Sequence, residues 1–288
     1  MSDSIIFKQR GDDISISATG KIPVPGKKDL LLEASAILKE ITDCQIRLAD
    51  IKSRSKDNDS NKNDVHSKLV QLLITIRNHY THLLLQFPTS CLIAVAPTQD
   101  LHGSLWKHCF YGQIEEYRKS IRKCLKIIEN GNANNNSGGD SNSKELNRAQ
   151  HHLTRAITSY AKILGDGIAF YSELMLKVEK QLKYIRSAYT KSQSNLQLHR
   201  KKKSRSNNVD TVEVQIESKN AYLSQKKDLL NSIYRCLLYL GDLSRYKELN
   251  KSENGSEEKV YTEAQRYYER ASLIQPYNGN PHNQIAVL

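Results

Sequence analysis

The adjacent residues Arg245 and Tyr246 could bind a phosphate group. They are the last two residues of the largely apolar segment from Cys236 to Tyr246, and we expect them at the centre of a helix. Arginine carries a permanent charge on a planar fork of N–H groups, which can engage two phosphate oxygens at once. The neighbouring tyrosine hydroxyl adds one neutral donor. Asp242 precedes Arg245 by one helical turn, so a structural ion pair is the alternative role for this arginine.

A helical hairpin is the element expected to position this pair. In a tetratricopeptide hairpin, the first helix contains Leu-Gly, and the second contains small, aromatic and small residues at a fixed spacing before a proline. The small residues let the two helices approach closely, and the polar run 250–258 lengthens the turn between them. The residues of this chain that occupy those positions are Leu240, Gly241, Ala264, Tyr268, Ala271 and Pro276.

Four further helices are predicted upstream of the hairpin. Apolar residues recur at helical spacing at about 28–53, 65–87, 100–129 and 144–193, and Gly165-Asp-Gly167 predicts an interruption in the last of these. Six prolines and 13 glycines are few for 288 residues, which argues against many short strands. The predicted fold is all-α, with long helices burying their apolar stripes in an antiparallel array.

The domain organisation follows from composition. Residues 1–27 lack helical periodicity and are interpreted as a disordered arm, and residues 28–288 as one helical domain. Segments rich in Asn, Ser, Gly or Lys predict low-complexity loops near 53–64, 130–143 and 199–208. The string Asn278-Gly-Asn-Pro281 starts another helix shortly before Leu288. We interpret that end as a truncation at the start of a further C-terminal helical domain.

The net charge of +12 suggests an acidic partner, such as nucleic acid, a phosphorylated protein or anionic lipid. The compact basic run at 199–205 has three alternative roles: a solvated loop, a nuclear-localisation signal or a contact with RNA phosphates. Aromatic residues are not interleaved with this run, which argues against a platform for base stacking.

Several function classes find no support in the sequence. The five cysteines are scattered and form no Cys-x-x-Cys pair, so neither a disulfide framework nor a zinc site is expected. Adjacent carboxylates such as Glu115-Glu116 point to different helix faces, and no phosphate loop or nucleophile elbow occurs. We therefore expect no enzyme, metal or cofactor in this chain. It also has no signal segment and no apolar run of about 18 residues, so no membrane partner is expected.

Several strings occur in order along the chain and together resemble the amino-terminal region of the Smg/Est family. This family comprises the nonsense-mediated mRNA decay factors five, six and seven and the telomerase-associated Est proteins. The resemblance covers roughly residues 65–288. The string at 106–111 and Ser244 look more like members five and six. The strings are Leu105-Trp-Lys-His-Cys-Phe-Tyr111, Leu240-Gly-Asp-Leu-Ser-Arg-Tyr246, Tyr267-Tyr-Glu-Arg-Ala271 and Asn278-Gly-Asn-Pro-His-Asn-Gln-Ile-Ala286.

The resemblance implies a 14-3-3-like fold with tetratricopeptide-like hairpins. It implies a non-enzymatic adaptor in nonsense-mediated mRNA decay that binds phosphoserine or phosphothreonine in an upstream, phosphorylated decay helicase. Arg245 and Tyr246 match the family's phosphate arginine and the tyrosine after it. Asn283 resembles the asparagine that holds a bound peptide's backbone in 14-3-3 grooves, and capping the start of a helix is the alternative.

The second basic residue of the phosphate site departs from the family pattern. Where member seven has a lysine, this chain has Tyr111. Lys107 lies one turn earlier and Arg118 two turns later, so both could project near Tyr111. A basic pair seven residues apart on one helix is how 14-3-3 proteins present their phosphate clamp, which favours Arg118. The alternative is that Lys107 and Arg118 are ordinary solvated charges.

A second function remains open because Est members associate with telomerase RNA and telomeric DNA. In that reading, the basic chain is a telomerase-associated, nucleic-acid-binding protein. The resemblance also allows pairing with a sibling family member through the 14-3-3-like region, and it implies a cytoplasmic and nuclear location. Some relatives carry a nuclease domain far downstream of the region that this chain resembles.

Overall fold

The computed structural model describes residues 27–54, 62–87, 89–96, 100–133, 140–202, 209–252 and 260–288. These residues form helices and turns and no β-strand, which confirms the predicted all-α fold. The elements are α1 (Lys27–Arg54), α2 (Lys62–Gln86), α3 (Thr89–Val95), α4 (Leu101–Trp106), the π-helix η2 (Lys107–Tyr111), α5 (Gly112–Ala133), α6 (Asp140–Lys202), α7 (Val209–Ser252), α8 (Thr262–Ile274) and α9 (Gly279–Ala286).

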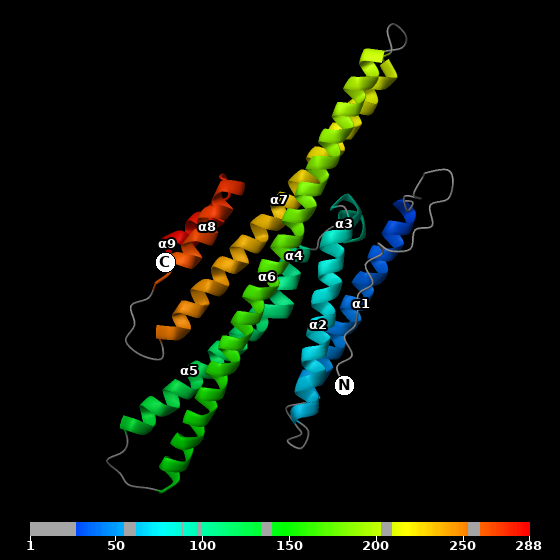
Figure 1. The fold of residues 1–288 in the computed structure, drawn as a ribbon. Coiled ribbons are helices and arrows are strands. Elements are labelled where there is room, and N and C mark those ends of the chain that lie inside the picture. Colours follow the sequence, from blue (N-terminus) through cyan, green and yellow to red (C-terminus); the bar gives the residue numbers. More distant parts are fainter. Residues whose placement is uncertain are drawn as a thin grey trace, which may run out of the picture.

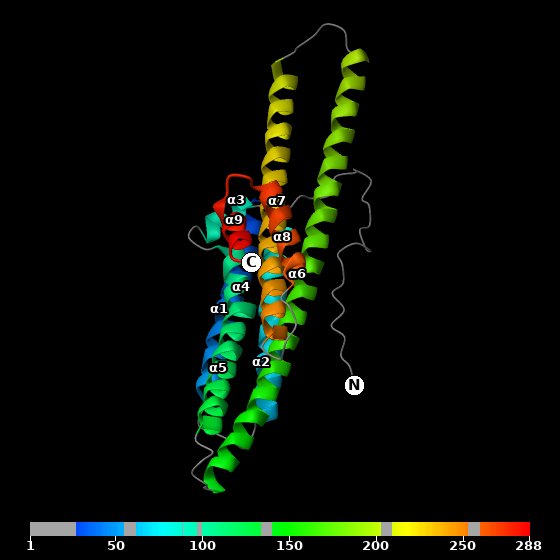
Figure 2. The same ribbon diagram turned by 90° about the vertical axis from the view of Figure 1, so that its left-hand side faces the viewer.

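Helices α6 and α7 form an antiparallel hairpin that is the spine of the molecule (Figure 1). Helix α5 packs along the first part of α6, and α8 packs along the last part of α7 with α9 beside it. The α1–α2 pair lies on another side, where α2 contacts α4, η2 and α6. The end of α6 near residue 202 and the start of α7 near residue 209 extend beyond all other helices in both views (Figure 2). The structure thus confirms an antiparallel helical array.

Helix α6 differs from the sequence expectation because it runs without a break through Gly165 and Gly167. Gly167 serves packing instead of ending the helix. A Cβ atom placed on it would lie 3.0 Å from the side chain of Leu243 and 3.3 Å from that of Phe110. The glycine therefore lets α7 and η2 approach α6 closely, and burial of the surrounding side chains offsets the weak helix propensity of glycine.

The predicted loops are shorter than expected. Helix α5 continues to Ala133, α6 begins at Asp140 and extends to Lys202, and α2 begins at Lys62. Asn, Ser and Lys each cost only a few tenths of a kcal/mol in a helix, so packed helices extend into segments of such composition. The remaining parts of these predictions, at 1–26, 55–61, 134–139, 203–208 and 253–259, lie outside the described residues.

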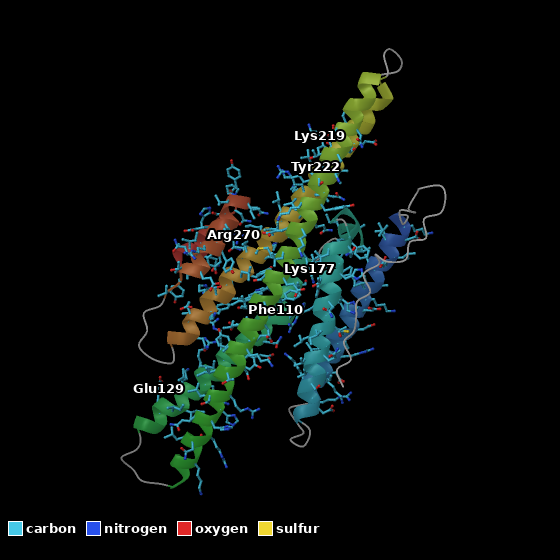
Figure 3. All side chains as sticks on the ribbon, viewed as in Figure 1. Phe110, Glu129, Lys177, Lys219, Tyr222 and Arg270 are labelled. Carbon is cyan, nitrogen blue, oxygen red and sulfur yellow. The ribbon has the colours of Figure 1, made fainter. Side chains whose placement is uncertain are left out.

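An aromatic cluster joins the α4–η2 segment to the spine. Trp106 stacks on Tyr239 of α7 with ring centroids 4.7 Å apart, and Phe110 lies 5.2 Å from Tyr171 of α6. Figure 3 shows Phe110 at the centre of the array. The π-helix is closed by the Gly112 N–H, which donates to the Lys107 carbonyl five residues earlier. Such insertions into a helix shift the register of the residues that follow and often mark functional sites.

The α7–α8 hairpin has the close approach that the small residues predicted. A Cβ atom on Gly241 would lie 2.3 Å from Cε1 of Tyr268, and Tyr268 is completely buried. Ala264 is also buried, at 1% exposure. Only glycine fits at position 241 with the Tyr268 ring in its observed place, so the prediction of close helix contact here is confirmed.

Within the described part of the chain, the four cysteines that can be placed are free and buried. Burial raises the pKa of Cys109 and of Cys236 to about 12, so both thiols are protonated and unreactive at neutral pH. No group of His, Cys, Asp and Glu side chains suited to a metal ion occurs among these residues. The described helices include none that could cross a membrane.

His102 is a buried titratable group that couples folding to pH. Its Nε2 lies 3.0 Å from Oγ of Ser232, and burial lowers its pKa to about 4. An unfolded chain binds a proton at this histidine near pH 6.5, whereas the folded chain does not do so until about pH 4. Folding stability is therefore lost as pH falls from 6.5 to 4, by about 3 kcal/mol from this group.

We expect His102→Gln to flatten this acid dependence. Urea unfolding of the wild type and the variant at several pH values measures the pH dependence of the unfolding free energy. The contributions of the other titrating groups cancel in the difference between the two proteins. The matched control is His151→Gln on the exposed face of α6, which should leave the slope unchanged. Parallel pH profiles for the wild type and His102→Gln would contradict the assignment.

Candidate functional site

The phosphate-binding pair predicted from the sequence is joined by Arg118 in the structure. Arg245 and Tyr246 lie on α7 and Arg118 lies on the neighbouring α5. The guanidinium carbon of Arg245 is 4.8 Å from the centroid of the Tyr246 ring, and that of Arg118 is 5.3 Å from the same centroid. Both distances are typical of cation–π contacts. One tyrosine ring thus holds two permanent cations from different helices in one site.

Arg245 is oriented by Asp242 and Tyr268. Its Nη2 donates to Oδ1 of Asp242 over 3.5 Å, and the Tyr268 hydroxyl donates to the same oxygen over 2.8 Å. The ion pair that was the alternative role of Arg245 therefore does form. It uses one of the five N–H groups of the guanidinium, and Nε is buried without a partner. Asp242 can consequently fix Arg245 in place while other N–H groups remain for a ligand.

The electrostatics of the site are set mainly by burial. Burial raises the pKa of Asp242, while the hydrogen bond from Tyr268 and the charge of Arg245 oppose that rise. Burial also raises the pKa of Tyr246, and the nearby Asp242 adds to the effect, while Arg245 and Arg118 oppose it. The Tyr246 hydroxyl therefore keeps its proton at neutral pH and can act as a donor.

Arg118 is more accessible to solvent than Arg245 and is held by Glu115. Its Nη1 donates to Oε1 of Glu115 over 2.6 Å, and the two side chains are 35% and 23% exposed. Partly exposed ion pairs between residues one helical turn apart contribute about 1 kcal/mol. An incoming anion can therefore displace Glu115 at little cost. The neighbouring Glu116 instead pairs with Lys52 of α1, which confirms that the adjacent carboxylates point to different faces.

The other candidate residues divide into two groups. Tyr111 is 39% exposed and lies close enough to Tyr246 to influence its pKa, so it belongs to the site. Lys107 is exposed, and no contact among the described residues brings it to Arg245 or Tyr246. Asn283 is exposed within α9, and the cap of that helix is Asn278, whose side chain accepts from the Asn280 N–H. The capping alternative for Asn283 is therefore wrong.

A small pocket next to Arg118 was not predicted. It has a volume of about 100 Å³ and lies one helical turn along from the cation–π contacts, between α5, α6 and α7. Its lining includes Arg122 and Asn250, and Oδ1 of the buried Asn250 has no hydrogen-bond partner. No sequence pattern indicated this pocket, because Asn250 stands at the start of a polar run that predicts a turn.

Comparisons with known proteins agree with these features. The family model described as "Telomerase activating protein Est1" matches residues 100–251, which is more than half of the chain, and "Est1 DNA/RNA binding domain" matches residues 264–288. The first match contains η2, α5 and most of α7, and so includes Tyr111, Arg118, Arg245 and Tyr246. No solved structure is significantly similar to the chain.

Three curated proteins are similar to the chain. Nonsense-mediated mRNA decay factor SMG7 of Arabidopsis thaliana is 26% identical over 75% of this chain and 18% of its own length. Telomerase-binding protein EST1A of Danio rerio is 24% identical over 68% of the chain and 9% of its own length. Telomere elongation protein est1 of Schizosaccharomyces pombe is 23% identical over 79% of the chain and 39% of its own length. The chain thus spans less than two fifths of each relative.

The Est1 model and these relatives agree with the Smg/Est resemblance of the sequence strings, and the strings fall on the helices that build the site. The chain therefore belongs to the Est1 family, which includes nonsense-mediated mRNA decay factor SMG7 and the telomere protein est1.

Proposed function

We propose that this chain is a phosphopeptide-binding adaptor that reads phosphoserine or phosphothreonine in a partner protein. The observation that carries the proposal is the convergence of Arg118 and Arg245 on the ring of Tyr246. A phosphate dianion is bound best by permanent charges with several N–H donors, and two arginines supply both. Tyr246 and Tyr111 would add hydroxyl donors at the same place.

The partner that the family suggests is a phosphorylated RNA helicase of nonsense-mediated mRNA decay. One relative is named as a decay factor, and two are named for telomerase or telomeres. In this proposal the chain itself carries out no reaction and acts in the cytoplasm and nucleus, where decay and telomere proteins work. Residues 28–288 would form the 14-3-3-like and tetratricopeptide-like region, which could also pair with a sibling protein, and Asn283 would contact the peptide backbone.

The test is a direct binding titration. A pool of degenerate peptides with a fixed central phosphoserine, and the same pool with serine, are titrated against the 288-residue chain by fluorescence anisotropy. We expect the phosphorylated pool to bind at least tenfold more tightly, because the second pool lacks the dianion that the two arginines recognise. Equal affinities for the two pools would refute the proposal.

Nucleic-acid binding is the second candidate, and the protruding part of the α6–α7 hairpin favours it. The stretch of α6 that leads into this part carries Lys180, Lys183, Arg186 and Lys191, all exposed and without an ion pair among the described residues. Tyr184 stands between them and is 73% exposed. On α7, Lys219 and Tyr222 lie on the same protruding part (Figure 3). A basic surface with an exposed aromatic ring suits a single-stranded nucleic acid.

This second function predicts a strong dependence of binding on salt. Each phosphate contact with single-stranded nucleic acid contributes about 0.7 to the slope of log K against log salt concentration. Replacing Lys180, Lys183 and Arg186 with Gln should therefore reduce the slope for a poly-uridine probe by about 2. The matched control replaces three exposed lysines of α5, namely Lys119, Lys123 and Lys126. Equal slopes for the two triple variants would contradict binding through the hairpin.

A further inference from the structure

A cavity of about 330 Å³ opens where α2, α3, α4, α6 and α7 meet. On α7 it is lined by residues between Gln225 and Ser232. Arg245 stands roughly 20 Å further along the same helix. The cavity is therefore separate from the candidate phosphate site and does not depend on the proposed function. Its volume is at the lower end of the range found for ligand-binding pockets.

The walls of the cavity are largely apolar. Leu85 and Phe87 line it from the end of α2, Leu92 and Ile93 from α3, and Leu229 from α7. Ile93 is 56% exposed, which leaves a large apolar side chain in water at this cavity. Apolar side chains of a ligand would bury this surface, and the free energy gained grows with the apolar area removed from water.

The charge at the cavity is acidic in a chain that is basic overall. Asp100 lines the cavity and is neutralised by Arg235, whose Nη2 lies 3.1 Å from Oδ2 of the aspartate. Asp228 also lines it, is half-buried, and has no ion pair within the described ranges. A carboxylate without a partner beside an apolar cavity suits a ligand that carries a lysine or arginine next to its apolar side chains.

Two buried polar atoms of lining residues have no hydrogen-bond partner among the described residues. His102, only 6% exposed, uses Nε2 for Ser232 and leaves Nδ1 without a partner. Gln181 donates from Nε2 to the Leu85 carbonyl over 2.7 Å and leaves Oε1 without a partner. Unpartnered buried polar groups are costly, so a ligand that pairs them gains affinity. One peptide unit, with its N–H and its C=O, has the complementary groups.

We propose that this cavity binds a short peptide segment of a partner protein, in which apolar side chains lie next to a lysine or arginine. The apolar side chains would fill the space between α2, α3 and α7. The basic residue would pair with Asp228, and one peptide unit would reach the polar atoms of His102 and Gln181. This site would give the chain a second contact with a partner that is independent of phosphorylation.

The experiment uses three capped eight-residue peptides as probes. The first contains two leucines beside two lysines, the second has serines in place of the leucines, and the third has glutamates in place of the lysines. Binding to the 288-residue chain is followed by NMR of labelled isoleucine methyl groups. We expect the first peptide to shift the methyl signals of Ile93 and Ile185, which line the cavity, and not that of Ile121 near Arg118. Compared with the first peptide, the serine peptide should bind at least tenfold more weakly, and the glutamate peptide about threefold more weakly.

Variants locate the binding site. Ala96 lines the cavity and Ala94 of the neighbouring turn is exposed and does not, so Ala96→Trp should weaken binding of the leucine peptide at least tenfold and Ala94→Trp should not. Asp228→Lys should weaken it several-fold, whereas Asp43→Lys on the exposed face of α1 should not. Circular dichroism confirms that each variant is folded.

Three results would overturn the proposal. They are equal affinity for the leucine and serine peptides, unchanged binding by Ala96→Trp, and preference for the glutamate peptide. Binding of a small apolar dye such as anilinonaphthalene sulfonate in the cavity, with no binding of the leucine peptide, would also overturn it. Replacing Arg245 with Gln should leave leucine-peptide binding unchanged, so failure here and failure of the phosphate site are distinguishable.

Discussion

Replacing Arg245 with Gln should weaken binding of the phosphoserine peptide pool by about 100-fold. The variant removes a permanent cation that is only 18% exposed, and charge-assisted hydrogen bonds at such positions contribute about 1.5 to 3 kcal/mol. Glutamine is preferable to glutamate here. A glutamate would place a second carboxylate beside Asp242, whose pKa burial already raises, and would destabilise the fold as well as the site. Fluorescence anisotropy with the phosphorylated pool measures the loss.

The same titration separates the candidate partners of Arg245. Arg118→Gln should weaken binding by about tenfold, because Arg118 is more exposed and must first leave Glu115. Lys107→Gln should change nothing, since Lys107 lies apart from the tyrosine that both arginines contact. Glu115→Gln frees Arg118 and should strengthen binding several-fold. A large loss in Lys107→Gln with no loss in Arg118→Gln would show that the second cation has been misassigned.

The sequence predicted the helices because their apolar periodicity is long and regular. It also predicted the hairpin contact, since Gly241 and Tyr268 fill positions with a defined packing role. It did not predict the continuity of α6 through Gly165 and Gly167. Local helix propensity predicts a break at two closely spaced glycines. Only the tertiary contact with Leu243, which is distant in sequence, shows that position 167 requires a small residue for close packing.

The candidate site was predicted in part, for a similar reason. Arg245 and Tyr246 are adjacent in the chain, so their proximity needed no tertiary information. Arg118 and Lys107 flank Tyr111 on one helical run, and helical periodicity alone placed both near it. In the structure Lys107 begins the π-helix of residues 107–111 and Arg118 lies on α5 beyond it, and only the packing of α5 against the spine selects Arg118. The role of Asp242 as an anchor of Tyr268 likewise depends on a contact 26 residues apart in the chain.

The second large effect is expected from Gly241→Ala, which should destabilise the fold by about 2 kcal/mol. Alanine in a helix is normally favoured over glycine by about 1 kcal/mol. At this position the added Cβ would lie 2.3 Å from the Tyr268 ring, so α8 must move away from α7. Overpacking of a well-filled core costs about 1 to 3 kcal/mol or more, and it exceeds the gain in helix propensity. Urea unfolding of the variant and the wild type measures the difference.

Two further variants show whether the ring contact is the cause. Gly165 lies on the exposed face of α6 with no atom within 4 Å of an added Cβ, so Gly165→Ala should stabilise the fold by about 0.5 to 1 kcal/mol. Tyr268→Leu removes the ring, and the double variant Gly241→Ala, Tyr268→Leu should be less destabilised than the sum of its parts. If the free-energy changes of the two single variants simply add up in the double variant, the contact between position 241 and the Tyr268 ring is not the cause of the destabilisation. Because Tyr268 also anchors Asp242 beside Arg245, Gly241→Ala should weaken phosphopeptide binding too, whereas Gly165→Ala should not.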